Sequence, residues 1–324
     1  ERASISPSPL PESPMFTQSL ILLTSRELTL DDVEGALGDF EVLGRTGGDE
    51  NAHWAFGAPA LVVPLPGTVD GRVVVDVINE RWPDVPGDPE EDPGLFAAWS
   101  MGGFGPGAFP GCLERAGTQC WTWKQASVAV RQHKGFIRLR TTYVADDETT
   151  GVPDDQDLQE ELLFLTKMAH ALGGVVGVMC LFDPAGEAIR PPQIVDQAME
   201  WLELDDALPL DLWTNVRVGK LDDEGAWLVM DSVGMQQLGL PDVEVAFPRE
   251  AFTFEQIDEL VRDVLFYLAT SGDVITDGDG LDGPDDTTWI AVRFEGGRNL
   301  PPRPVIRLVQ DGAEVPEAFI ARPQ

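Results

Sequence analysis

The sequence predicts an α+β fold, with largely antiparallel sheets and amphipathic helices packed on one face. Short strand-like runs follow one another with few helices between them, whereas a doubly wound parallel sheet would alternate strand and helix. Two long segments, 158–172 and 254–268, carry apolar residues at helical spacing. Because 43% of the 324 residues are apolar, including 9 Trp and 15 Phe, the chain can bury a sizeable core.

The chain divides into two predicted halves. Residues 1–15 are rich in Pro and Ser without apolar periodicity, which is typical of a disordered arm. An N-terminal α+β half follows at 16–145, an acidic linker at 146–157 and a C-terminal α+β half at 158–324. Both halves combine strands with an amphipathic helix, which leaves two related halves open, although no residue period repeats.

The N-terminal half opens with a strand and a helix. The apolar run 19–23 predicts a buried strand, and Thr29 with Asp32 three residues later predicts a capping box at the start of a short helix. The elements expected next are strands at 53–56 and 60–65 and either a strand or a helix at 73–78.

Composition changes sharply over residues 83–119. An acidic, Pro-rich stretch runs to position 93, and the glycines of 102–107 exclude regular structure. We interpret this segment as a long loop or an insertion. Beyond it, 121–130 and 136–143 predict a β-hairpin whose turn lies at 132–135.

The C-terminal half begins with the amphipathic helix at 158–172. A second helix is expected to start at Pro191 and Pro192, and a third at a capping box formed by Thr253 and Gln256. An acidic, Gly-rich loop is expected at 273–286. The expected strands are 175–182, 212–218, 226–231, 243–247, 289–294 and 305–308.

The charge excludes some classes of partner. Against 56 Asp and Glu stand 22 Lys and Arg, a formal net charge of -34 that repels the phosphates of nucleic acids and anionic lipid surfaces. No apolar run approaches the roughly 18 residues of a membrane helix. We therefore expect neither nucleic-acid nor membrane binding. The 3 Cys, sparse in so long a chain, indicate reduced thiols and a cytoplasmic location.

No assembled catalytic or cofactor motif is present. Ser100 lies in a segment that approximates a nucleophile elbow, but the glycines and prolines after it prevent the helix that the motif requires. The same glycines lack the spacing of a dinucleotide fingerprint or a P-loop, and no His or Cys pair has zinc-ligand spacing. The sequence therefore predicts a protein that is not an enzyme, with no cofactor and no metal.

One dense cluster of carboxylates occurs in the Gly-rich loop of the C-terminal half. An EF-hand starting there would need other residue types at Leu281, Asp282 and Thr288, so the calcium pattern fails. We predict a surface that binds a basic partner, with a solvated loop or an irregular calcium loop as alternatives. The residues are Asp277, Asp279, Asp282, Asp285 and Asp286.

Aromatic residues crowd the Gly- and Pro-rich segment. Trp99, Phe104 and Phe109 are predicted to anchor a partner, because rigid rings dominate many protein interfaces. The alternative is a satellite core that holds the long loop in place, together with Trp121 and Trp123.

Several short motifs are spread over most of residues 16–295. They are the strand at 19–23 with its helix, Leu-Val-Val-Pro-Leu-Pro at 61–66, His-Lys-Gly-Phe at 133–136, Gly-Val-Val-Gly-Val at 174–178, Pro-Leu-Asp-Leu-Trp at 209–213, Gly234 with Gly239, Pro-Asp-Val-Glu at 241–244 and Asp-Gly-Asp at 277–279. Together these motifs resemble a bacterial family known as a domain of unknown function, DUF4261. The resemblance implies relatives near type VI secretion and polymorphic-toxin loci, some of them similar to immunity or accessory proteins, and it implies no catalytic residues.

The leading hypothesis is a non-catalytic, acidic protein-binding module that engages a basic effector as a toxin-immunity or secretion-accessory protein. It depends on the charge, the missing catalytic motifs and the family resemblance. The rivals are a metal-assisted hydrolase that uses the loop at 277–286 with one histidine, and a structural protein of a secretion locus. The identity of the partner and the oligomeric state stay open.

Overall fold

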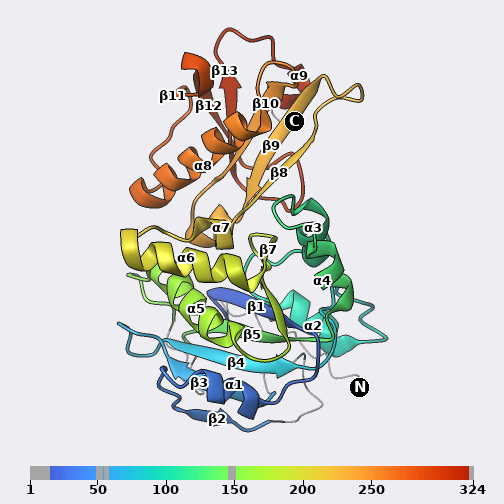
Figure 1. Ribbon diagram of the computed structural model, residues 1–324, viewed down its shortest axis with the longest axis vertical. Helices are drawn as coiled ribbons and strands as arrows, with labels where there is room; N and C mark the ends of the chain where they lie inside the picture. Colours follow the sequence, from blue (N-terminus) through green and yellow to red (C-terminus); the bar gives the residue numbers. More distant parts are fainter. Residues whose placement is uncertain (1–14, 49–53, 55–57, 145–150, 321–324) are drawn as a thin grey trace, which may run out of the picture.

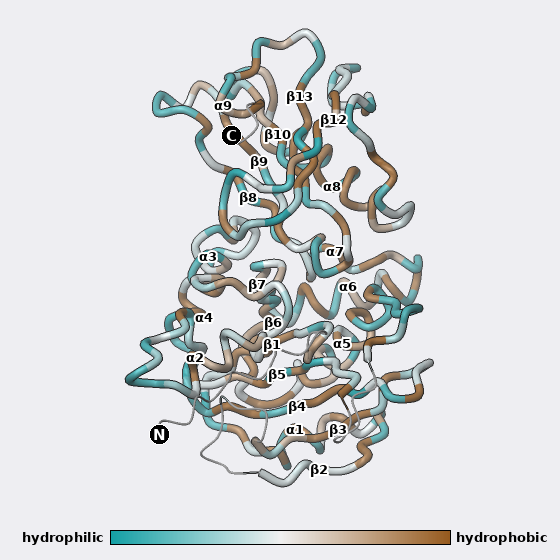
Figure 2. The backbone as a smooth tube through the Cα atoms, turned by 180° about the vertical axis from the view of Figure 1, so that it is seen from behind, coloured by the Kyte–Doolittle hydropathy of each residue, from teal (hydrophilic) through white to brown (hydrophobic). Residues whose placement is uncertain are grey.

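The computed structural model describes residues 15–48, 54, 58–144 and 151–320. Two sheets lie one above the other along the long axis, each with its own helices (Figure 1). Viewed from behind, the apolar stretches follow the strands inside the molecule and the hydrophilic stretches lie in outer loops (Figure 2). With both sheets mostly antiparallel, the predicted α+β class is confirmed.

The first lobe, residues 15–205, is built on a seven-stranded sheet in the order β2-β3-β4-β5-β1-β6-β7, with every neighbouring pair antiparallel. The predicted strand at 19–23 becomes β1 and is buried along its whole length. The strands are β1 (Gln18–Thr24), β2 (Gly44–Thr46), β3 (Ala60–Pro64), β4 (Arg72–Ile78), β5 (Gly135–Thr142), β6 (Val178–Asp183) and β7 (Ala188–Arg190).

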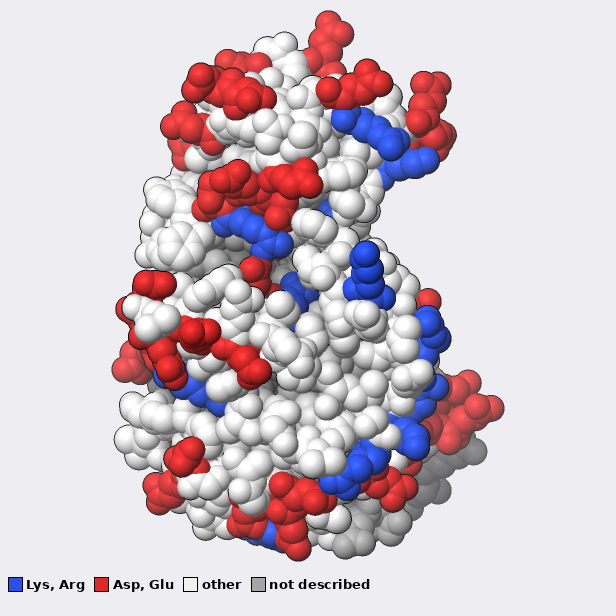
Figure 3. Space-filling model, in the orientation of Figure 1, with Lys and Arg blue, Asp and Glu red and all other residues white. Residues whose placement is uncertain are grey.

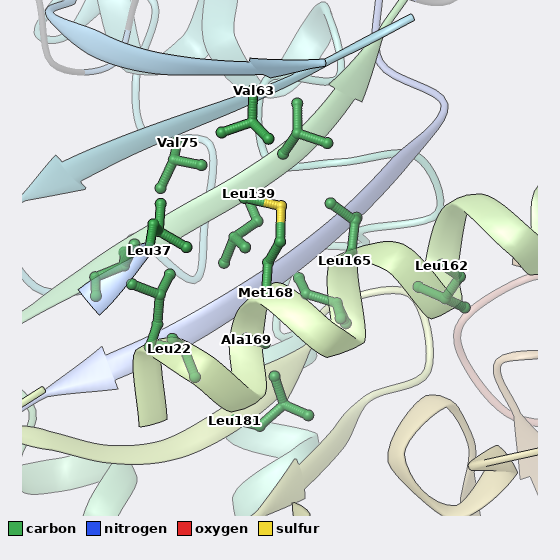
Figure 4. Packing of buried hydrophobic residues seen from close by; sticks show 14 of the residues in the cluster. Leu22, Leu37, Val63, Val75, Leu139, Leu162, Leu165, Met168, Ala169 and Leu181 are labelled. Atoms are coloured by element: carbon green, nitrogen blue, oxygen red, sulfur yellow. The ribbon is translucent and has the colours of Figure 1, made fainter. Parts of the chain in front are cut away.

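Helices cover both faces of this sheet, where the sequence predicted one face. Side chains alternate along a strand, so Leu20 and Leu22 of β1 point to one face and Ile21 and Leu23 to the other. The first face packs on α1 (Leu30–Ala36), α5 (Leu158–Gly173) and α6 (Pro192–Asp205); Figure 4 shows Leu165 and Met168 of α5 against the strands. The second face packs on α2 (Pro93–Ser100), α3 (Cys112–Gln119) and α4 (Ala126–Gln132).

The second lobe, residues 214–320, holds a six-stranded sheet in the order β11-β12-β13-β10-β9-β8, in which β10 and β13 are parallel. The residues just before it pack Leu212 and Trp213 into the first core. Helix α8 (Phe254–Ser271) covers one face. The two sheets have different strand orders. The remaining elements are α7 (Leu210–Trp213), β8 (Asn215–Lys220), β9 (Trp227–Val233), η1 (Met235–Leu238), β10 (Asp242–Pro248), β11 (Gly280–Asp282), η2 (Pro284–Asp286), β12 (Thr288–Phe294), β13 (Val305–Gln310) and α9 (Glu317–Ile320).

Three local expectations need correction. The first arm of the predicted hairpin is the helix α4, because Ala126 and Ala129, three residues apart, both pack into the core beside α3. The segment 83–119 contains the helices α2 and α3 on either side of its glycines, and Asp92 caps the first of them. The strand expected at 212–218 begins only after α7. The strand expected at 53–56 falls outside the described residues except for Trp54.

The division into halves also differs from the prediction. The residues of α5, β6 and β7 were expected in the C-terminal half. Strands β6 and β7 instead extend the first sheet, and α5 packs on its face. The boundary between the two sheets therefore lies between β7 and β8 rather than at 146–157, because β6 pairs with β1 across a long separation in sequence. Within the described ranges, no helix has the length and apolar character that crossing a membrane requires.

Both predicted capping boxes are confirmed, at Thr29 with Asp32 and at Thr253 with Gln256. The latter starts α8, whose Leu260 and Val264 face the second core.

We expect Leu260→Ala to lower the free energy of unfolding by about 2 to 5 kcal/mol, because it removes buried methyl groups and leaves a cavity. The matched control is Glu259→Ala, its exposed neighbour on the same helix. Urea unfolding checks this, and equal midpoints for the two variants would contradict it.

The turn between β6 and β7 joins the lobes through buried polar contacts. Asp183 accepts two backbone N–H groups of its own turn through Oδ1 and the Nε2 of Gln237, from the second lobe, at 2.9 Å through Oδ2. Buried Glu187 accepts from Arg115 of the first lobe at 2.8 Å and from Arg217 of the second at 3.2 Å. The relative position of the lobes thus depends on charged groups that water does not reach.

Stability should depend on the ionisation of Asp183. Burial raises the pKa of this carboxyl from 3.8 to about 7, so the folded protein keeps a proton that the unfolded chain releases. The contribution of Asp183 to stability therefore falls as the pH rises from about 4 to about 7, by about 1.4 kcal/mol per pH unit. Asp183→Asn should remove this dependence. Urea unfolding at several pH values measures it, with exposed Asp282→Asn as the control; identical pH profiles for wild type and Asp183→Asn would refute it.

Candidate functional site

Of the aromatic residues predicted to bind a partner, Phe104 lies in the core and Trp99 packs against it. Phe104 is only 1% exposed, and its ring centroid lies 4.7 Å from that of Trp99 and 5.1 Å from that of Trp82. Trp99 is half-buried and donates from Nε1 to the carbonyl of Pro83 at 3.1 Å. Phe109 is half-buried beneath the guanidinium of Arg115. The structure thus shows a core around Phe104, Trp99 and Trp123 that holds the long segment, whereas Trp121 is 48% exposed, and Phe104 is too buried to contact a partner.

The five aspartates of the acidic loop are all exposed at the far end of the second lobe, around β11 and η2. Several are held by local donors: Asp277 accepts the backbone N–H of Arg293, Asp279 that of Thr276, and Asp285 the amide of Gln256. The backbone N–H of Thr276 also lowers the pKa of Asp279. Across the described parts of the chain, no three His, Cys, Asp or Glu side chains gather to hold a metal ion. Partner binding by this loop stays a prediction.

A groove of about 560 Å³ lies between α6, α7 and α8, where the two lobes meet. Its volume is that of a ligand site rather than a packing defect. The walls are mostly apolar and come from both lobes. The lining includes Trp123, Ile194, Gln197, Trp201, Leu208, Pro209, Leu265 and Phe266.

The two long walls follow from helix periodicity. Helix α6 buries Val195 and Met199 in the first core, which turns the neighbouring stripe of Ile194 and Trp201 toward the groove. Helix α8 likewise turns Phe266 to the groove. Trp201 and Phe266 are each 50% exposed. Large rings left open to solvent on facing helices indicate a surface that another molecule covers.

Two arginines lie at the floor of the groove. Arg190, at the end of β7, donates to the carbonyls of Asp211 at 2.7 Å and Thr214 at 2.9 Å. Arg262 of α8 pairs with the carboxylates of Asp211 and, at 2.8 Å, Asp258. Burial, with a further contribution from Glu255, raises the pKa of Asp258 to about 6.

Acidic side chains occupy the outer surface of both helices. Glu255, Glu259 and Asp263 are exposed on α8, and Glu200 and Glu203 on α6. Figure 3 shows acidic side chains gathered over α8, with basic side chains directly below them toward the boundary between the lobes. The groove thus combines an apolar interior with an acidic rim.

Sequence reasoning missed this groove although a signal was present. The helix from Pro192 carries Ile194 and Trp201 outside its buried stripe, and the helix from Thr253 carries Phe266 outside its own. Apolar residues beyond one stripe on two amphipathic helices indicate an uncovered surface. Only the fold could show that the two helices face each other.

The segment that supplies one wall of the groove is also the segment that matches a known family. Residues 231–309 match the model of DUF4261, a domain of unknown function. The suspected resemblance is thereby confirmed over the end of β9 through β13, which includes α8. The other wall, α6 and α7, lies outside the DUF4261 match. No curated protein and no solved structure matches the chain.

Proposed function

We propose that this protein is a non-catalytic binding module that holds a basic segment of a partner protein in the groove between α6 and α8. The observation that carries the proposal is the pair of half-exposed rings, Trp201 and Phe266, on facing walls of an apolar groove with an acidic rim. An amphipathic segment laid into such a groove buries its apolar side and leaves its charged side at the rim.

The two kinds of surface have separate roles. Aromatic side chains in a desolvated pocket supply most of the binding free energy of a typical interface. Exposed charges mainly raise the association rate and select partners of opposite sign. With a formal net charge of -34, the protein attracts a basic partner from a distance, and the groove then retains it.

The biological setting in this proposal is that of a toxin-immunity or secretion-accessory protein in the cytoplasm. It is supported by the DUF4261 resemblance, which implies relatives near type VI secretion and polymorphic-toxin loci. The cysteines Cys112, Cys120 and Cys180, all free of disulfides, are consistent with a reducing compartment.

Co-expression with the protein encoded by the neighbouring gene tests the proposal, which expects that protein to be basic. We expect a complex that Trp201→Ala and Phe266→Ala each weaken at least about tenfold, the usual cost of removing an aromatic anchor. Tyr267→Ala is the matched control, since Tyr267 is 48% exposed on α8 but does not line the groove. If the neighbour is toxic, the groove variants should also fail to restore growth. Equal losses at Phe266 and Tyr267 would place the interface elsewhere.

Association should also depend on salt. Exposed charges are screened beyond about 8 Å at physiological ionic strength, so the association rate should fall steeply between low and physiological salt. Stopped-flow mixing of the purified partners measures it. An acidic partner, or a rate indifferent to salt, would remove the electrostatic part of the proposal.

A further inference from the structure

The buried arginine at the floor of the groove has no carboxylate in direct contact; the nearest anionic influence is that of Asp183, at longer range. Arg190 is only 5% exposed, and among the described residues no carboxylate lies within 4.0 Å of its guanidinium nitrogens. Its acceptors are the carbonyls of Ile189, Asp211 and Thr214 and the sulfur of Cys120. Buried cations in proteins are normally paired with an anion, because removal from water is costly otherwise.

A second guanidinium stands close to the first. Arg262 is partly exposed at the same floor, and its pKa is lowered by burial and then by the positive charge of Arg190. Its Nε and Nη1 atoms pair with Asp258 and Asp211, whereas its Nη2 has no hydrogen-bond partner in the described part of the chain. The groove therefore holds two guanidinium groups at its floor, where the carboxylates of Asp211 and Asp258 contact Arg262 but not Arg190, and the Nη2 of Arg262 is left as a donor.

We infer that the groove receives the C-terminal end of the partner chain, with the terminal carboxylate facing Arg190 and Arg262. This inference rests on the proposed function and specifies its ligand. A carboxylate bound by guanidinium groups makes charge-assisted hydrogen bonds, and capture of a chain terminus is a known mode of peptide recognition.

A chain end accounts for all three features of the site together. The last residue brings a carboxylate and an apolar side chain to one point, which matches arginine donors beneath walls such as Ile194 and Phe266. Basic residues earlier in the same segment would then pass the acidic rim of α8. In an internal aspartate or glutamate the side chain itself is the carboxylate, so the apolar group would have to come from a different residue.

Fluorescence anisotropy with two peptide pools tests the inference. Both pools carry an N-terminal fluorophore, are lysine-rich in their first half and are randomised among Leu, Ile, Phe and Trp in their second half. One pool ends in a free carboxylate and the other in an amide. We expect the free acid to bind at least about tenfold more tightly, as a charge-assisted contact predicts.

Variants then assign the effect to the groove. Arg262→Gln, at a side chain that is 31% exposed, should abolish the preference for the free acid, whereas exposed Arg249→Gln should preserve it. Arg190→Gln should act like Arg262→Gln where its unfolding midpoint shows a folded protein. Equal binding of acid and amide would overturn the chain-end inference, as would no binding of either pool. If acid and amide bind equally but Trp201→Ala abolishes the binding of both, the proposed function stands and only the chain-end inference fails.

Discussion

Asp76→Asn should destabilise the protein by about 3 to 5 kcal/mol, because it leaves two buried arginines without their carboxylate. Asp76 on β4 accepts from Arg138 at 2.9 and 2.5 Å and from Arg140 at 3.0 Å, and all three side chains are buried between the sheet and the segment around Gly103. Both arginines also donate to the carbonyl of Gly103.

The electrostatics of this cluster support the size of the effect. Burial opposes ionisation of Asp76, but the charges of Arg138 and Arg140 outweigh it and hold its pKa below the usual value. Burial and the neighbouring Arg138 lower the pKa of Arg140 to about 9 even with Asp76 present. Losing the carboxylate of Asp76 increases the positive charge that the interior must hold without water.

Urea unfolding of Asp76→Asn measures the loss, with exposed Asp31→Asn as the matched control. If the variant does not fold well enough to measure, replacing Asp76, Arg138 and Arg140 together by apolar residues of similar volume should restore much of the stability, as for other buried ion pairs. A change below about 1 kcal/mol for Asp76→Asn would show that water reaches the cluster.

Gly186→Ala should cost at least about 3 kcal/mol, at the upper end of overpacking effects. A Cβ on Gly186 would lie 2.8 Å from the carbonyl carbon of Trp213 and closer still to its oxygen. The obstacle is backbone rather than a flexible side chain. Since Trp213 ends α7 and is buried in the first core, relief would require the turn or α7 to leave its packing there.

Gly35→Ala is the control, because a Cβ there meets nothing within 4 Å. Inside the helix α1 this change should stabilise the protein slightly, by about 0.4 to 1 kcal/mol. Thermal unfolding compares the melting temperatures of the two variants, and binding of the free-acid peptide pool compares their grooves. Similar melting temperatures for Gly186→Ala and Gly35→Ala would contradict the prediction, because they would show that the turn accommodates a Cβ without loss of stability.

The elements predicted correctly have signals that lie within a few residues. The capping boxes at Thr29 and Thr253 need only a side chain three positions ahead, and the stripe through Leu260 and Val264 repeats at the helical period. The helix α4 was misassigned because its short apolar run, residues 128–130, fits strand and helix about equally. Its packing against α3 decides for the helix.

The candidate site depended on longer-range relations. Phe104 and Trp99 were grouped correctly as neighbours, but the local pattern could not distinguish an interface anchor from a core residue. Nor could it distinguish Arg190 from a surface arginine, because its neighbours in space come from α7 and the segment at 120–123.

The sequence by itself determined the α+β class, the capping boxes of α1 and α8, the apolar stripes of α5 and α8, the strongly acidic character and the resemblance confirmed at residues 231–309. Tertiary structure alone decided which faces are covered: it buried Phe104, paired Asp76 with Arg138 across two strands, and set α6 opposite α8 to form the groove. The physical reason is the distance along the chain over which each interaction acts. Propensity and capping act over one helical turn, whereas burial depends on elements that only the folded chain brings together.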